Sequence, residues 1–338
     1  MAIMIVYMKQ YSAFFLIAML FLMSGIYLLD DWPRIEAWVT ISQLLEQVDV
    51  QLILHLRLPR LIMAICNGLL LSLAGALTQA IFKNPLAAPS LVGVSTGASL
   101  FAAFFIFASS QLALGFLDGV SIPMAAFVGA SLTCLMVFRL SWIAGKSNLA
   151  ILILAGVAVN AVCGALLGFL IFSADDESLR SINFWSLGSI GSQEWSAVLI
   201  TAITTVIVVI FSFRFADALN AISLGESVAR HLGFSVEKIK VQTIALIALS
   251  VGVSVSFCGL IGFVGLVVPH IARMIWGAEN RQVLKGCVIL GPSLILLADY
   301  VAKTVVFPAE LPIGIVTSGV GGPFFMYLLL RYKKRGHL

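Results

Sequence analysis

The feature that most constrains this chain is its series of long apolar runs without a charged residue. One of them, LIMAICNGLLLSLAGALTQAIF from Leu61 to Phe82, is long enough to cross a bilayer as a helix, which takes about 20 apolar residues. Hydrophobic residues make up 61% of the chain and charged residues only 11%, with a mean hydropathy of +1.08. A backbone in hydrocarbon must satisfy its own hydrogen bonds, so these runs predict an all-α polytopic membrane protein. The runs are Gln10 to Leu29, Leu61 to Phe82, Asn84 to Leu117, Gly119 to Phe138, Leu149 to Ala174, Trp195 to Phe213, Val241 to Pro269 and Leu311 to Leu330.

Two regions decide how many spans there are. Asn84 to Leu117 is too long for one span, and the prolines of NPLAAP predict a turn followed by one helix from about Ser90. Gly262 to Trp276 is short and carries a proline, a histidine and an arginine, so it is either a short span or a re-entrant segment. Gly286 to Lys303 gives a further span. Counting Gly262 to Trp276 as a span makes ten, and an even number puts both termini on one side of the membrane.

The basic residues test that count, because Lys and Arg concentrate on the cytoplasmic side of membrane proteins. With ten spans and a cytoplasmic N-terminus, fifteen of the 20 Lys and Arg lie inside and five outside, namely Arg34, Arg57, Arg60, Arg180 and Lys303. Dropping the doubtful span would move the basic C-terminal segment RYKKR outside. The charge distribution therefore favours ten spans with both termini in the cytoplasm.

The segment DALNAISLGESVARHLGFSVEKIK, Asp217 to Lys240, is polar and amphipathic, and this topology places it in the cytoplasm between two spans. Ser223 and Glu226 match a capping box, in which a serine and a glutamate three residues later satisfy each other's backbone amides. Gly233 stands where a helix commonly ends in a left-handed glycine. The pattern predicts a helix from Leu224 to Leu232, preceded by a separate short helical turn. It is either an interfacial helix on the headgroups or a rigid docking element for a partner protein.

Residues that carry chemistry are scarce. Gly145-Lys146-Ser147 matches the end of a phosphate-binding loop, but Leu140 stands where the first glycine is required and no strand is predicted before it. The chain has neither an HExxH motif nor a pair of catalytic acids, so we expect no enzyme activity and no catalytic residue. The five cysteines lie in or beside apolar runs without metal-binding spacing, which predicts packing residues and no metal site.

Five longer blocks resemble, in the same order, the permease subunits of ATP-driven importers for iron complexes and cobalamin. They are LRLPR (Leu56 to Arg60), AGALTQAIFKNPLAAPSLVGVSTGAS (Ala74 to Ser99), LGESVARHLG (Leu224 to Gly233), GFVGLVVPHIAR (Gly262 to Arg273) and ELPIGIVTSGVGGPFF (Glu310 to Phe325). The resemblance covers nearly the whole chain and implies one permease domain over 1–338, with the ten-helix type II ABC importer fold, in the cell inner or plasma membrane. It also implies a second permease subunit as a homodimer, two cytoplasmic ATPase subunits and an external substrate-binding protein, with no nucleic-acid partner.

The resemblance assigns residues to the two faces of the membrane. The stretch at about 216–233 would form coupling helices that sit in a cleft of the ATPase, and ATP and Mg²⁺ would bind only the ATPase, so this chain would hold no cofactor. Arg57, Arg60 and Lys303 would pair with acidic residues of the binding protein, although a lysine at 303 cannot form the bidentate pairs of an arginine. Simple anchoring of a span at the headgroups remains open for Arg57 and Arg60. The coupling residues so implied are Leu219, Ser223, Leu224, Gly225, Glu226, Arg230 and Gly233.

The fifth and tenth spans resemble helices that line the central path of such importers at the dimer interface. Gly164 and Gly168 in the fifth span also form a small-xxx-small pattern, which is more typical of close helix packing, and we predict packing there. The path residues that the resemblance implies are Asn160, Gly314, Gly321 and Gly322.

The external segment from Asp175 to Trp195 resembles haem permeases somewhat more than siderophore or cobalamin permeases. The expected substrates are therefore haem first, ferric siderophores second and cobalamin third. His270 is interpreted as structural rather than as a haem ligand, because the block around it also resembles permeases whose substrates contain no haem. The alternative from another class is a secondary transporter driven by an ion gradient, but it would place ionisable residues in mid-membrane, and the clear spans are nearly free of them.

Overall fold

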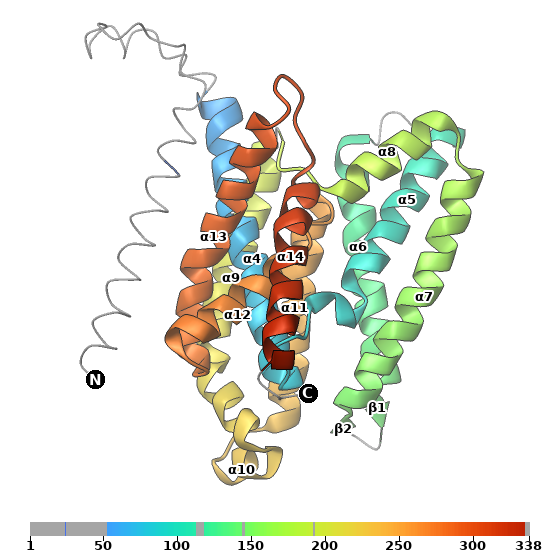
Figure 1. The fold of residues 1–338 in the computed structure, drawn as a ribbon. Coiled ribbons are helices and arrows are strands. Elements are labelled where there is room, and N and C mark those ends of the chain that lie inside the picture. The colour runs from blue at the N-terminus through green and yellow to red at the C-terminus, as the bar shows by residue number, and fades with distance from the viewer. Residues whose placement is uncertain (1–23, 25–52, 113–117, 144–145, 192, 335–338) are drawn as a thin grey trace, which may run out of the picture.

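The computed structural model describes residues 53–112, 118–143, 146–191 and 193–334, together with Ser24. This part of the chain is helical apart from turns and a small hairpin (Figure 1), and the predicted all-α fold is confirmed. The helices are α4 (Leu58–Phe82), α5 (Val94–Leu112), α6 (Asp118–Leu140), α7 (Leu149–Ser173), α8 (Asp176–Leu187), α9 (Trp195–Leu224), α10 (Glu226–His231), α11 (Val236–Cys258), α12 (Val264–Trp276), α13 (Asn280–Thr304) and α14 (Ile313–Lys334), and the hairpin strands are β1 (Trp142–Ile143) and β2 (Lys146–Ser147).

Six of these helices, α4, α6, α7, α9, α11 and α13, are long and apolar enough to cross a membrane. Shorter apolar helices lie in α5, α12 and α14. The doubtful segment forms α12, whose 13 residues extend about 20 Å at 1.5 Å per residue, less than the roughly 30 Å of a hydrocarbon core. The predicted first span, Gln10 to Leu29, lies outside the described residues apart from Ser24. The total of ten spans therefore stays a prediction.

Helix α4 lies at the centre of the bundle and contacts α9, α11, α12 and α13 (Figure 1). In its most apolar window 83% of the residues are buried, against 28% for α7. Two glycines let neighbouring helices approach α4 closely. A Cβ on Gly75 would lie 1.7 Å from the carbonyl oxygen of Gly265 in α12, and a Cβ on Gly68 would lie 2.5 Å from the nitrogen of Pro292 in α13. Contacts between small residues, which let apolar helices associate in lipid, are thus centred on α4.

Helices α5, α6 and α7 form a second group beside this bundle, with α8 lying across one end of it (Figure 1), and α6 joins the group to the bundle by packing on α11. The turn predicted at NPLAAP is present. Lys83 follows α4 with a φ of 51°, and a 3₁₀ turn, Pro89–Val92, leads to Gly93 with a φ of 81°. The next helix begins at Val94 rather than at about Ser90, because the left-handed glycine ends the 3₁₀ turn and the α-helix can start only after it.

Helix α9 runs without a break from Trp195 to Leu224, which is 30 residues or about 45 Å. The sequence had predicted a span ending at Phe213 and a separate turn after it, and this division is wrong. The residues after Phe213, RFADALNAISL, include no glycine or proline and several strong helix formers, so the helix continues beyond the apolar layer. It ends at Gly225, whose φ of 138° and ψ of 144° are accessible almost only to glycine.

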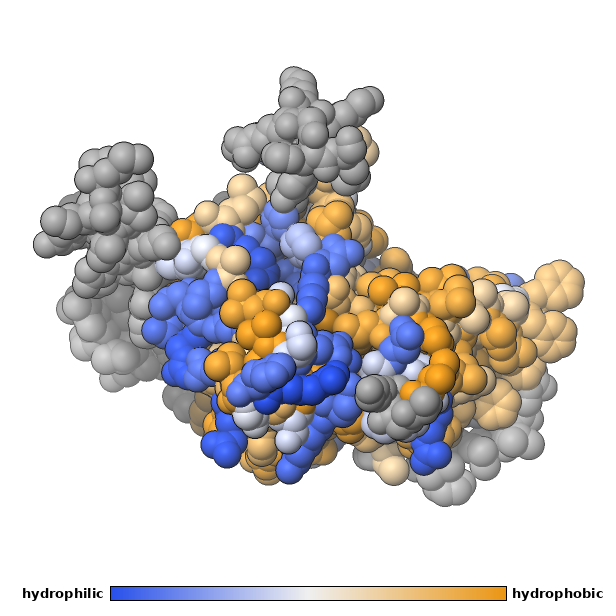
Figure 2. All heavy atoms as spheres, turned by 90° about the horizontal axis from the view of Figure 1, so that it is seen from below, coloured by the Kyte–Doolittle hydropathy of each residue, from blue (hydrophilic) through white to orange (hydrophobic). Residues whose placement is uncertain are grey.

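The helix ends divide between two faces of the molecule. The start of α4, the end of α13 and α8 lie at one face, and α10 and the β1–β2 hairpin lie at the other (Figure 1). The described basic residues that were predicted to lie outside, Arg57, Arg60, Arg180 and Lys303, all belong to the first face. Seen from the opposite face, hydrophilic residues gather in the middle of the view and apolar residues cover the flank on the right (Figure 2). The placement of Arg57, Arg60, Arg180 and Lys303 at the face opposite α10 fits the predicted orientation, with α10 in the cytoplasm.

Candidate functional site

The face predicted to be cytoplasmic carries a short projection, formed by the end of α9, Gly225, α10 and the turn that follows. Gly233 closes α10 with a φ of 87°. Its amide donates to the carbonyl oxygen of Arg230, and the amide of Phe234 donates to that of Ala229, both at 3.0 Å. These two bonds form a Schellman motif, in which a left-handed glycine satisfies the last carbonyl groups of a helix. The predicted stop glycine is confirmed.

The predicted capping box is wrong. Ser223 lies in the last turn of α9, where its hydroxyl donates to the carbonyl oxygen of Asn220 at 2.6 Å. A capping serine needs a non-helical backbone, and the continuation of α9 through Ser223 denies it one. The N-cap of α10 is Gly225 instead, and α10 has six residues rather than the longer helix predicted from Leu224 to Leu232.

Three apolar side chains are exposed on the projection. Leu224, Val228 and Leu232 are 75%, 40% and 62% exposed. Exposed apolar side chains rimmed by polar ones commonly mark a surface that binds another protein. Val228 and Leu232 were not among the predicted coupling residues, although their four-residue spacing from Leu224 was a signal. Among the predicted coupling residues, Ser223, Leu224, Arg230 and Gly233 are exposed, Gly225 and Glu226 are partly buried, and Leu219 is buried in the core.

Glu226 is the electrostatic centre of the projection. Its carboxylate lies 2.7 Å from Nζ of Lys240 and 3.2 Å from Nη2 of Arg230. The hydrogen bond from Lys240 lowers the pKa of Glu226 below its ordinary value, partial burial opposes this, and the positive charges of Lys240, Arg230 and Lys83 add to the lowering. The carboxylate therefore stays ionised and keeps both cations in place at neutral pH.

A second set of polar contacts ties the base of the projection to α13. Glu279 caps α13 by accepting from the amides of Arg281 and Gln282 at 2.8 and 2.9 Å, and it also accepts from the side chain of Asn220 at 2.9 Å. The amide of Asn280 donates in turn to Asn220 at 2.9 Å. Burial raises the pKa of Glu279, but the hydrogen bonds from Asn220 and the two amides outweigh it and lower the pKa. The end of α9 and the start of α13 are therefore joined.

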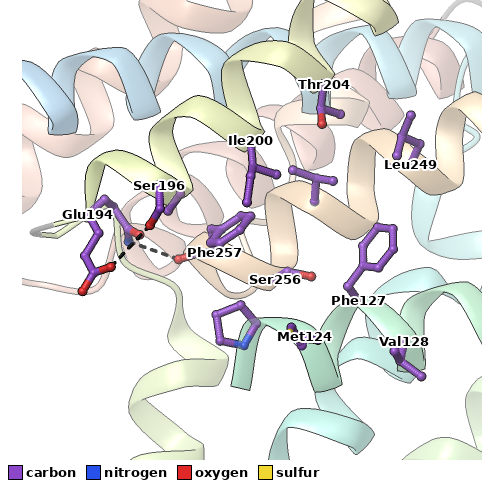
Figure 3. A pocket seen from close by; sticks show the side chains of 14 residues that line it. Met124, Phe127, Val128, Glu194, Ser196, Ile200, Thr204, Leu249, Ser256 and Phe257 are labelled. Atoms are coloured by element: carbon purple, nitrogen blue, oxygen red, sulfur yellow. Dashed lines mark hydrogen bonds between the residues drawn. The ribbon is translucent and has the colours of Figure 1, made fainter. Parts of the chain in front are cut away.

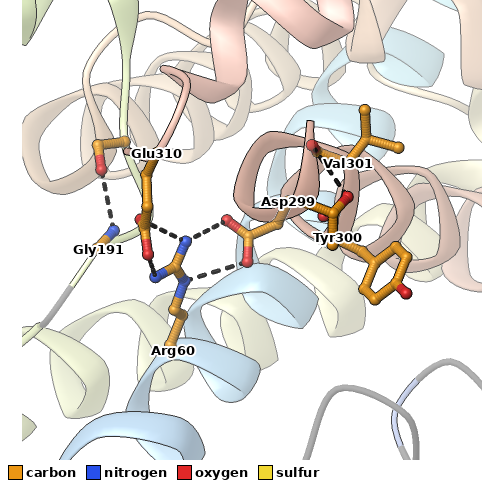
Figure 4. A network of polar contacts seen from close by, with 8 residues as sticks. Arg60, Gly191, Asp299, Tyr300, Val301 and Glu310 are labelled. Carbon is orange, nitrogen blue, oxygen red and sulfur yellow. Dashed lines mark hydrogen bonds and ion pairs between the residues drawn. The ribbon is translucent and has the colours of Figure 1, made fainter. Parts of the chain in front are cut away.

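At the face predicted to be external, Arg60 is held by two carboxylates (Figure 4). Nε and Nη2 donate to Asp299 at 3.1 and 3.0 Å, while Nη1 and Nη2 donate to Glu310 at 2.9 Å each. The side chain of Asp299 is 2% exposed and that of Glu310 is 50% exposed. Both edges of the planar guanidinium are thus occupied, and the contacts join α4, α13 and the loop before α14.

The predicted docking residues lie together at this face. Arg60 is one turn after Arg57, and both are partly buried, as is Lys303 near the end of α13. A hydrogen bond from Arg60 lowers the pKa of Glu310, partial burial opposes this, and the positive charges of Arg60 and Lys303 add to the lowering. Asp299 and Glu310 could not be predicted as partners of Arg60, because nothing local in the sequence marks the pairing.

Two of the predicted path residues touch the walls of a pocket of about 380 Å³, lined by residues of α4, α5, α11 and α12 and of the turns before α5 and α12. Asn160 in α7 donates to the carbonyl oxygen of Ser90 at 3.2 Å, and Ser90 lines the pocket. Phe263 also lines the pocket and covers Gly321 in α14, where a Cβ would lie 2.4 Å from the phenylalanine side chain. The fifth and tenth predicted spans, α7 and α14, therefore each contact a residue that lines this pocket.

The other small residues of α7 and α14 fall into two groups. A Cβ on Gly314 would lie 2.3 Å from the carbonyl oxygen of Leu187, so Gly314 packs tightly against the end of α8. Gly164, Gly168 and Gly322 face no atom within 4 Å. Within the described chain no helix packs on Gly164 or Gly168, so the close packing predicted there stays a prediction that another subunit would have to satisfy.

A larger pocket of about 720 Å³ lies between α6, α9 and α11 (Figure 3). Apolar side chains such as Met124, Phe127 and Ile200 form most of its wall. Near one end the hydroxyl of Ser196 donates to the carboxylate of Glu194 at 3.3 Å. Neither α7 nor α14 contributes to this wall, so the pocket is separate from the predicted path.

The segment that matched the end of a phosphate-binding loop lies in the β1–β2 hairpin. Trp142 pairs with Ser147 and Ile143 with Lys146, and the amide of Ser147 also donates to Glu237 at 3.0 Å. A phosphate-binding loop instead joins a strand to a helix with its amides open to the ligand. In the described ranges no group of three or more metal-ligating side chains occurs, and His270 is 4% exposed within α12, as expected of a structural histidine.

The described chain is an all-α bundle with six helices able to span a membrane, a projection at one face and an ion-pair cluster at the other, an architecture compatible with a permease, the class of membrane protein that carries a substrate across. The chain belongs to the FecCD transport family, whose family model matches residues 14–331. It is a multi-pass ABC importer permease of the cell inner membrane.

The relatives agree with this assignment. The hemin transport system permease protein HmuU of Yersinia pestis is 41% identical over 283 residues, which are 83% of this chain and 84% of the relative. The vitamin B12 import system permease protein BtuC of Salmonella arizonae is 36% identical over 299 residues, or 88% of each chain. A solved metal-chelate type ABC transporter in an inward-facing conformation has a TM-score of 0.83 and 29% identity, and the match covers 95% of this chain and 99% of that chain. The family resemblance stated from the sequence is confirmed.

Proposed function

We propose that this permease imports an iron complex, with haem as the first candidate and a ferric siderophore as the second. The higher identity to a hemin permease, 41% against 36% for a vitamin B12 permease, supports haem over cobalamin. The segment that resembled haem permeases includes α8, which lies at the face proposed to be external. Cobalamin import is the alternative substrate class.

The observation that supports ATP-driven import is the projection on the face predicted to be cytoplasmic. Leu224, Val228 and Leu232 present an apolar surface beside the ion pair of Glu226 and Arg230. We place a partner ATPase on this surface, with ATP and Mg²⁺ bound by the ATPase. Two such subunits, one for each permease, would close on ATP and push the projections together. This use of the projection favours a docking element over an interfacial helix.

An external binding protein is proposed to dock through Arg57, Arg60 and Lys303. Since Asp299 and Glu310 occupy both edges of Arg60, an incoming carboxylate can bind Arg60 only by displacing one of them. Asp299 is 2% exposed and Glu310 is 50% exposed, so Glu310 is the carboxylate that gives way. Docking would therefore exchange an intramolecular ion pair for an intermolecular one.

A second copy of this chain is proposed to pack along α7. This helix is the least buried of the six long spans, with 28% of its most apolar window buried. Gly164 and Gly168 leave room on it for the close approach of another helix. Between two copies, the pocket reached by Asn160 and Gly321 would face the shared path.

Reconstitution in proteoliposomes with an ATPase and a binding protein tests the proposed substrate. Uptake of haem, a ferric siderophore and cobalamin is measured side by side with ATP inside the vesicles and with ADP as the control. We expect ATP-dependent uptake of an iron complex, with haem fastest. ATP-dependent uptake of cobalamin alone would contradict the proposed substrate but would still show an ATP-driven importer.

A further inference from the structure

Lys240 in α11 is the only Lys or Arg buried among the residues whose burial the structure describes, with a side chain that is 2% exposed. Its ammonium group lies 2.7 Å from Glu226 and 3.4 Å from Glu237, and it donates to the carbonyl oxygen of Ser147 at 3.3 Å. An ammonium group has three N–H donors, and each finds an acceptor here. The three acceptors belong to α10, α11 and the β1–β2 hairpin, so one side chain joins three elements.

Ser147, which contacts Lys240, immediately precedes the N-cap of α7. The carbonyl oxygen of Ser147 accepts from Lys240, and its amide donates to Glu237 at 3.0 Å, so both backbone groups of Ser147 are held. The next residue, Asn148, is the N-cap of α7 and accepts from the amides of Ala150 and Ile151 at 3.0 and 3.2 Å. A displacement of Ser147 would therefore move the cap of α7.

The other side of the contact is α10, whose position is not fixed by helix continuity. Gly225 separates it from α9, and six residues are too few for a helix to be stable alone. A small apolar cluster that includes Ala221, Ala229 and Val236 holds α10 against α9 and α11. Glu226, the first residue of α10, is the point at which this helix contacts the buried ammonium group.

We infer that Lys240 is the positioning residue that transmits a movement of α10 to the start of α7. Glu226 forms the shorter of the two ion pairs of the buried ammonium group, 2.7 Å against 3.4 Å for Glu237, so Lys240 shifts with Glu226 when α10 moves, and its contact with Ser147 changes as a result. The inference rests on the proposed docking of an ATPase at α10. It adds a route by which ATP binding reaches α7, the helix proposed to line the path.

The test compares Lys240→Met with Lys238→Met in the reconstituted complex of permease, ATPase and binding protein. Lys238 is two residues earlier on the same helix and is exposed, so its variant removes the same charge without touching the buried contact. Hydrogen exchange is measured with and without ATP at the amides of α10 and at the first turn of α7, and the substrate transported per ATP hydrolysed is measured on equal amounts of assembled complex.

For Lys240→Met we expect the ATP-dependent change at α10 to persist and the change at the first turn of α7 to disappear. The substrate transported per ATP should fall at least about fivefold, the lower end of ordinary coupling between sites. Lys238→Met should match the wild type. A merely structural role would lower the yield of complex without altering transport per ATP or separating the two exchange signals.

If Lys240→Met does not assemble, Glu226→Gln carries the same test. The substituted side chain is 34% exposed in the wild type and keeps its size, and Glu237 still neutralises Lys240 in this variant, so we expect it to assemble with the same selective loss at α7. Equal responses at α7 in this variant and the wild type would overturn the inference. A wild-type complex that shows no ATP-driven uptake would instead overturn the proposed function.

Discussion

Glu310→Gln tests how the external face binds its partner. The substitution keeps the shape of the side chain but removes the charge of the half-exposed carboxylate that accepts two 2.9 Å bonds from Arg60. We expect the variant to bind the external binding protein more tightly than the wild type. The reason is that an incoming carboxylate no longer has to displace a charged competitor from the guanidinium.

The expected change in Kd follows from the exposure of the Glu310 side chain. Glu310 is 50% exposed, so water and salt screen the pair, and pairs of this kind contribute about 0.5–1 kcal/mol. Since about 1.4 kcal/mol corresponds to a tenfold change in Kd, the affinity should rise about two- to fivefold. Removing Arg60 would be a poorer test, because it takes the cation away from Asp299, which is 2% exposed. Breaking a buried pair in this way costs about 3–5 kcal/mol, so unfolding would obscure any change in docking.

Surface plasmon resonance on the permease complex in nanodiscs measures this affinity. Arg57→Gln is the comparison variant, because it removes a proposed docking charge while Arg60 and Glu310 are both kept, and it should weaken binding. Both effects should shrink at high salt, as expected for exposed charges. A Kd for Glu310→Gln that equals or exceeds the wild-type value, measured on fully assembled complex, would refute the exchange of partners at Arg60.

Three further predictions follow from the geometry. Ala229→Pro removes the amide that donates to the carbonyl oxygen of Gly225 at 3.0 Å, so it should abolish ATPase stimulation by the binding protein while the permease still inserts. Val228→Pro is the control, because the amide of Val228 lies before the first intrahelical bond of α10, and it should have a milder effect on the same ATPase assay. Because the pKa of Glu310 is lowered in the folded protein, its contribution to stability is present above the unfolded-state pKa and lost as the pH falls through the folded-state pKa. The stability difference between wild type and Glu310→Gln, measured by thermal unfolding, should therefore shrink on acidification, and a constant difference would contradict the assignment. Gly75→Ala should lower the melting temperature strongly, because its Cβ would lie 1.7 Å from a carbonyl oxygen in α12, while Gly164→Ala, with no atom within 4 Å, should leave the monomer unchanged and affect only assembly.

The spans could be predicted from the sequence because hydropathy reports directly which segments can lie in hydrocarbon. The apolar run from Leu149 to Ala174 became α7, Leu149–Ser173, with almost the same limits. The end of α9 could not be predicted in the same way. Hydropathy marks where the membrane ends, whereas a helix continues in water as long as its residues favour it, and α9 extends to Leu224 for that reason.

The candidate site, too, was predictable only where a local sequence signal reflects the local structure. Gly233 was predictable because a stop glycine is a local feature, and the capping box at Ser223 failed because the preceding helix continued through it. The pairs that hold the two faces together had no local signal. Arg60 and Asp299 are 239 residues apart in the chain, and Lys240 and Ser147 are 93 apart. Only the packing of α4 with α13, and of α11 with the hairpin, brings these residues together.

The central claim is that ATP, acting through the cytoplasmic projection, drives import by this permease. The most direct measurement is uptake of haem by proteoliposomes that contain the permease, ATPase and binding protein, with ATP supplied and the proton gradient collapsed by a protonophore. We predict uptake that requires ATP and is unaffected by the protonophore. Uptake that continues without ATP and stops when the proton gradient is collapsed would contradict the claim and favour a secondary transporter.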